Sequence, residues 1–157
     1  MDRILGVDPG SRITGYGVIE ADRGRLRFVA CGVIKTTIKY PLNYRLNEIF
    51  DGLNEVVQVH NPVVAAVEDV FVSENPRSAL KLGQARGAAV VAAMQNGLQV
   101  YDYTPRAIKQ AVSGYGQADK GQVQQMVRIL LALSGTPSSD AADALAVAIC
   151  HANQLNL

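Results

Sequence analysis

The stretch from Ser139 to Ile149, SDAADALAVAI, sets two acidic residues into an otherwise small and apolar segment. Asp140 and Asp143 are three residues apart, so a helix places both carboxylates on one face. The apolar neighbours predict a buried helix, where an ionised carboxylate is costly unless a cation offsets it. Capping of the helix start is an alternative explanation for Asp140, but it accounts poorly for Asp143, which lies a turn deeper.

Two more acids are predicted in apolar strands. The run ILGV at 4–7 predicts a buried strand that leads into Asp8, at the entrance of a Pro-Gly turn. The run VVAAVEDVF at 63–71 predicts a central strand that contains Glu68. A structural salt bridge is the alternative role for Glu68, and alternation along the strand turns Asp69 to the opposite side.

A set of four carboxylates suggests a particular chemistry. Oxygen-only donors suit Mg²⁺ or Mn²⁺, and two such ions can activate water and stabilise the leaving oxygen in phosphodiester hydrolysis. Zinc is not expected, because the chain has only two cysteines and two histidines and these lack metal-ligand spacing. The sequence therefore predicts a magnesium site built from Asp8, Glu68, Asp140 and Asp143.

The order of predicted elements defines the fold class. Three strands with short links predict an antiparallel meander, and later strands joined through helices predict parallel crossovers. This pattern gives an α/β fold with a five-stranded mixed sheet flanked by helices, in a single domain over residues 1–157. The expected strands are 4–7, 14–19, 26–34, 63–71 and 99–103, and the expected helices are 42–59, 78–96 and shorter segments that begin near 105, 120 and 139.

Composition and charge narrow the class of protein further. No apolar run approaches the roughly 20 residues of a membrane span, and no signal peptide is apparent. Cys31 and Cys150 are far apart, which favours reduced thiols and a cytoplasmic protein. Between Arg77 and Arg128 seven cations stand against two acids, an excess of five positive charges. Such a segment, which includes Lys81, predicts a phosphate-binding face, with an ordinary solvated surface as the alternative.

Four stretches resemble the RuvC family of Holliday-junction resolvases, in family order and over essentially the whole chain. One of them alone is a weak signal, since an Asp-x-Gly strand turn also occurs in actin-like ATPases, but all four in order are highly specific. The stretches are ILGVDPGS at 4–11 with TGYG at 14–17, Val67-Glu68 before Phe71, SALKLGQARG at 78–87, and DAADALA at 140–146.

The resemblance implies a ribonuclease H-like fold and Mg²⁺-dependent, symmetric nicking of four-way DNA junctions by a homodimer. It implies two ions per subunit, Mn²⁺ as a substitute, and handover from the RuvA–RuvB branch-migration complex. The matched catalytic acids are Asp8, Glu68, Asp140 and Asp143; Lys109 and Lys120 match residues at the DNA backbone, and Phe71 matches an aromatic that meets unpaired bases.

The resemblance also assigns the helix 78–96 to the dimer interface, and two departures from the family pattern stand out. Asp69 replaces an expected amide, which predicts additional negative charge beside the metals, and the sequence ends at Leu157 without a long basic tail. The alternatives to a nuclease are a non-catalytic junction-binding module and an actin-like ATPase. The second lacks the other half that such enzymes close around a nucleotide.

Overall fold

The computed structural model describes residues 2–69 and 75–155, so Phe71 lies outside the described part of the chain. The strands are β1 (Asp2–Asp8), β2 (Ile13–Asp22), β3 (Arg25–Lys35), β4 (Val64–Glu68) and β5 (Gln99–Tyr103). The helices are α1 (Leu42–His60), α2 (Pro76–Gln95), α3 (Pro105–Ser113), α4 (Lys120–Leu130) and α5 (Ser139–Gln154). No helix in these two ranges is both long and apolar enough to span a membrane.

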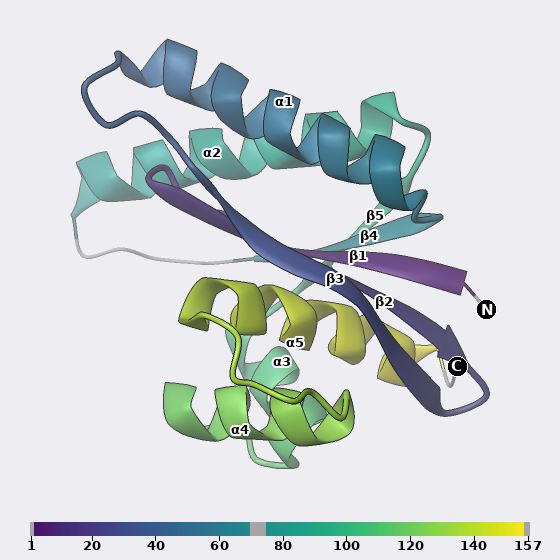
Figure 1. Cartoon of the computed structure of the whole chain (residues 1–157). Helices are drawn as coiled ribbons and strands as arrows, with labels where there is room; N and C mark the ends of the chain where they lie inside the picture. Colours follow the sequence, from purple (N-terminus) through teal and green to yellow (C-terminus); the bar gives the residue numbers. More distant parts are fainter. Residues whose placement is uncertain (1, 70–74, 156–157) are drawn as a thin grey trace.

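The strands form one mixed sheet in the order β3-β2-β1-β4-β5. The pairs β1–β2 and β2–β3 are antiparallel, whereas β4 pairs parallel with both β1 and β5. The predicted meander with parallel crossovers is therefore confirmed. Helices α1 and α2 cover one face of the sheet, and α5 covers the other with α3 and α4 outside it (Figure 1).

Alternation along β1 divides its side chains between the two layers. Leu5 and Val7 join the core beneath α1 and α2, whereas Ile4 joins the core beneath α5. Gly6 lies on the α5 side, where an added Cβ would come within 2.0 Å of the carbonyl oxygen of Ala144. The absence of a side chain at Gly6 thus lets the α5 backbone rest directly on the sheet.

Two local expectations differ from the structure. Helix α2 begins at Pro76, two residues early, because the side chain of Asn75 caps it by accepting from the amides of Arg77 and Ser78. Strand β4 ends at Glu68, which places this acid at the strand end. In the last turn of α5, His151 is fully buried, and its Nδ1 lies 2.6 Å from the Tyr103 hydroxyl.

Candidate active site at the edge of the sheet

Two of the predicted acids end neighbouring strands. β1 and β4 run parallel with Val7 beside Val67, so Asp8 and Glu68 follow at the same edge of the sheet. Alternation turns both side chains to the face that α5 covers, since Gly6 and Ala66, two residues earlier, lie on that face. The two carboxyl groups are joined by a hydrogen bond.

The other two acids come from the start of α5, which the sheet holds close. Gly15 pairs with Asp8 across the β1–β2 ladder, and an added Cβ on Gly15 would lie 2.1 Å from the Asp140 carbonyl oxygen. The first turn of α5 is fixed by Ser138, whose hydroxyl accepts from the Ala141 amide. Close packing at Gly15 therefore brings the helix that carries Asp140 and Asp143 against the strand end of Asp8.

These elements surround a cavity of about 210 Å³ at this edge. Helices α2, α4 and α5 all begin on the same side of the molecule, at the left of Figure 1. Three of the four predicted acids and two of the predicted DNA-binding lysines line the cavity, while Asp140 lies beside it. The lining residues are Asp8, Glu68, Pro105, Ile108, Lys109, Lys120, Val123 and Asp143.

Burial and mutual repulsion shape the charge of this group. The pKa of Asp8 rises from its ordinary 3.8 to about 9, first through burial, then through the hydrogen bond and charge of Glu68 and the charges of Asp143 and Asp140. Burial also raises the pKa of Asp143, against the opposing influence of Lys120. Burial and the three neighbouring acids therefore favour the protonated form of Asp8 at neutral pH.

The position of Lys120 at the start of a helix is explained by its contact with one of the acids. A cation at the first residue of α4 opposes the helix dipole, yet the Lys120 Nζ lies 3.3 Å from Asp143 Oδ2. The acids raise the pKa of Lys120, and Asp143 contributes most. Asp119 and Gln122 form a capping box that fixes the start of α4, which directs this lysine to the cavity.

Three other residues that the sequence analysis singles out do not line the cavity. Arg77 and Lys81 are exposed on the first turns of α2 and do not line the cavity. Asp69, expected to add charge beside the acids, instead follows β4 on the opposite face, where its Oδ1 lies 3.7 Å from Arg86 Nε. The predicted alternation along the strand is therefore confirmed, and the Asp69 carboxylate faces Arg86 instead of adding its charge to the four acids.

The carboxylates are close but are not arranged as a finished metal cage. Within residues 2–69 and 75–155, no three Asp, Glu, His or Cys side chains lie together at metal-ligand spacing. The hydrogen bond of Asp8 to Glu68 and the ion pair of Asp143 with Lys120 satisfy these groups among themselves. The donor set is nevertheless all carboxylate oxygen, which is the chemistry that hard divalent cations require.

The strand order and the two helical layers place the protein in the ribonuclease H-like fold class. Within that class, the chain belongs to the RuvC family. The family model described as "Crossover junction endodeoxyribonuclease RuvC" matches residues 4–151. Family membership favours the nuclease over the junction-binding module and the ATPase.

Individual relatives support this assignment over nearly the whole chain. The RuvC of Acinetobacter baumannii is 58% identical over 153 residues, which cover 98% of this chain and 84% of that protein. The RuvC of Cupriavidus metallidurans is 55% identical over 96% of this chain and 83% of that protein. The structure of T. thermophilus RuvC in complex with a Holliday junction substrate superposes with a TM-score of 0.93 at 37% identity, covering 99% of this chain and 96% of that one.

Proposed function

We propose that this protein resolves four-way DNA junctions by symmetric, divalent-metal-dependent nicking of the phosphodiester backbone during recombination and repair. The observation that carries the proposal is the pairing of Asp8 and Glu68 at the ends of parallel strands, in a cavity that Lys109 and Lys120 also line. Acids and cations in one cavity suit a metal that activates hydrolysis beside a bound phosphate. A cytoplasmic location fits a DNA substrate and two free cysteines.

The acids fit Mg²⁺ or Mn²⁺ by their chemistry and their electrostatics. Burial and then the neighbouring acids raise the pKa of Asp8, and a divalent cation would offset the negative charge of these acids. Asp8 and Glu68 would hold the ion from the sheet, and Asp140 and Asp143 would complete the set from α5. When bound, two such ions supply an activated water and stabilisation of the leaving oxygen. The chain itself contributes the fixed strand ends, the phosphate-binding lysines and an apolar wall.

We expect Lys120 to bind a phosphate of the DNA backbone once Asp143, its carboxylate partner, holds a metal ion. Lys120→Ala should slow junction nicking about 10–100-fold, the usual effect of removing a supporting group beside a metal site. It should also reduce the salt dependence of junction binding by about one unit of slope. Arg25→Ala, at the exposed start of β3 and outside the basic segment, is the matched control. An unchanged rate and slope for Lys120→Ala would contradict this role.

The proposed homodimer fits an exposed stripe on α2. Leu80, Val91 and Met94 are largely exposed there, and nothing lies within 4 Å of the positions that a Cβ would occupy on Gly83 and Gly87. A helix with an exposed small and apolar stripe suits close packing against a second copy of itself. Handover from the RuvA–RuvB complex stays a prediction from the family resemblance.

A single charge in this stripe should separate the subunits. Val91→Glu should raise the dimer dissociation constant roughly 100-fold, since each dimer loses two buried valines at about 1.5 kcal/mol each. Analytical ultracentrifugation over a concentration series measures the shift. Val91 is 50% exposed and Ile129 on α4 is 58% exposed, so Ile129→Glu is the matched control. Equal dissociation constants for both variants would place the interface elsewhere.

The experiment that tests the function pairs two assays on a synthetic four-way junction and on a linear duplex of the same sequence. A gel shift without metal should show preference for the junction. With Mg²⁺ or Mn²⁺, paired symmetric nicks should appear on the junction, and EDTA should abolish them. Junction binding without any metal-dependent product would favour the non-catalytic module, and no preference over duplex would refute a four-way substrate.

A further inference from the structure

A second group of cations lies at the turn after β1 and at the loop between β3 and α1. Residues 9–19 and 35–47 contain Arg12, Lys35, Lys39 and Arg45 but no acid. The nearest acid along α1 is Glu48, whose carboxylate accepts from the Thr37 amide at 2.9 Å and from the Thr37 hydroxyl at 2.8 Å. Arg12, Lys35 and Lys39 are exposed, and none of them forms an ion pair within the described ranges. This charge is separate in sequence from the basic segment between residues 77 and 128.

The loop is fastened to the turn that follows Asp8. The Thr36 amide donates to the Arg12 carbonyl at 2.9 Å, and the Thr36 hydroxyl donates to the Ser11 carbonyl at 2.6 Å. The buried Arg45 donates from Nη2 to the same Ser11 carbonyl at 2.7 Å and from Nε to the Thr36 hydroxyl at 3.2 Å. Arg45 therefore ties the loop to the active-site turn, and its charge has no acidic partner among the described residues.

The same loop exposes side chains that usually seek a partner. Tyr40 is 48% exposed on the loop beside the exposed Ile38, and Tyr44 is 64% exposed in the first turn of α1. Tyrosine hydroxyls and lysine ammonium groups both donate to phosphate oxygens, and such contacts position a protein on a nucleic acid without reading its sequence. Cations and tyrosines on a loop held in place suit a polyanionic backbone better than an apolar partner.

Register places the end of β3, where this surface begins, two strands away from Asp8. Asp8 pairs with Gly15 on β2, and Gly15 pairs with Val33 on β3, two residues before Lys35. Two inter-strand spacings amount to about 10 Å, or roughly three nucleotides at about 3.4 Å each. Lys109 lies toward the opposite edge of the sheet, on the helix that follows β5.

We propose that Arg12, Lys35, Lys39, Tyr40 and Tyr44 form a second contact surface for the DNA backbone. This surface binds phosphates about three or more nucleotides from the cleavage position, on the side of Asp8 away from Lys109. The inference rests on the proposed function for the identity of the cleaved strand. It extends that function by giving the junction arm a contact on each side of the acids.

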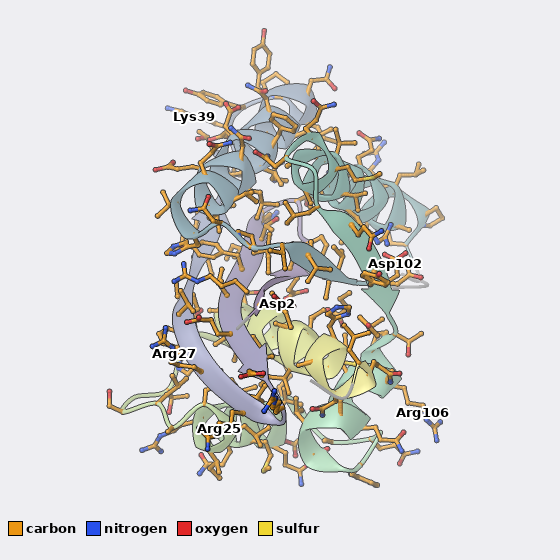
Figure 2. The ribbon with its side chains drawn as sticks, turned by 90° about the vertical axis from the view of Figure 1, so that its right-hand side faces the viewer. Asp2, Arg25, Arg27, Lys39, Asp102 and Arg106 are labelled. Carbon is orange, nitrogen blue, oxygen red and sulfur yellow. The ribbon has the colours of Figure 1, made fainter. Side chains whose placement is uncertain are left out.

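The test compares two variants that each remove two positive charges. Lys35→Gln/Lys39→Gln changes the proposed surface, and Arg23→Gln/Arg25→Gln changes the β2–β3 turn. Figure 2 shows Lys39 and Arg25 at opposite ends of the molecule. Metal-free gel shifts over a salt series should show on the order of tenfold weaker junction binding for the first variant and a salt slope reduced by about 2, with the second unchanged.

A linear duplex in the same titration separates this inference from the proposed function. Backbone contacts need no junction, so the first variant should weaken duplex binding too. If wild type shows no junction preference but the duplex difference persists, the proposed function fails and the contact surface stands. If the two double variants behave alike on both DNAs, the surface is wrong and the effect is one of net charge alone.

Replacing single phosphates by neutral methylphosphonates locates the contact. Neutral linkages placed about three nucleotides from the nick, on one side of it, should weaken wild-type binding but not binding by Lys35→Gln/Lys39→Gln. Equal weakening of both proteins at every position would overturn the assignment. Thermal unfolding of both double variants should match wild type, because the replaced side chains are exposed.

Discussion

Asp8→Asn should slow junction nicking on the order of 10³-fold while leaving metal-free junction binding intact. The amide keeps the size of the carboxyl group but cannot offer a negative charge to a divalent cation, and loss of one preorganised group commonly costs this much in rate. The measurement is a single-turnover nicking assay with Mg²⁺, alongside a gel shift without metal. Wild-type nicking by Asp8→Asn would remove Asp8 from the proposed metal site.

The same variant has a second signature that separates a lost charge from a misfolded protein. The pKa of Asp8 lies near 9 in the fold against 3.8 ordinarily, so between these values the unfolded chain has released a proton that the folded chain keeps. Stability of the metal-free wild type should therefore fall as pH rises from about 4 toward 9. Asp8→Asn lacks this loss, so its advantage in melting temperature should grow with pH. A lower melting temperature for Asp8→Asn at pH 8 would contradict the burial argument.

Gly6→Ala should destabilise the fold by about 3 kcal/mol or more, the upper end of what overpacking costs. The new Cβ would lie 2.0 Å from the Ala144 carbonyl oxygen and 2.8 Å from the Ala148 amide nitrogen. Both atoms belong to the α5 backbone, so the helix as a whole must move. Urea unfolding followed by circular dichroism measures the loss.

A matched glycine makes this prediction specific. Nothing lies within 4 Å of the position that a Cβ would occupy on Gly135, so Gly135→Ala should unfold at the wild-type midpoint. Nicking should fall with stability in Gly6→Ala, since displacement of α5 carries Asp140 and Asp143 away from Asp8. Equal urea midpoints for the two variants would show that α5 can move away from the sheet without a loss of stability.

Much of the architecture could be predicted because its signals are local. Alternating and helical periodicities mark each strand and helix, and the Asp119–Gln122 spacing predicts a capping box that is present. The ends of strands and helices are harder to predict where a contact with another residue fixes them. β1 extends through Asp8 because Gly15 pairs with it, and α2 begins at Pro76 because Asn75 caps it.

The sequence by itself determined the elements, the mixed sheet, the family resemblance and the identities of the four acids. Tertiary structure alone decided which charges meet. Lys120 reaches Asp143 across 23 positions, Asp69 turns to Arg86, and Arg45 holds a carbonyl 34 positions away. Hydrophobic periodicity predicts which face of a single helix or strand is buried. These contacts depend instead on strand register and on glycines that let a helix approach the sheet. Such long-range pairings leave no local pattern in a single chain.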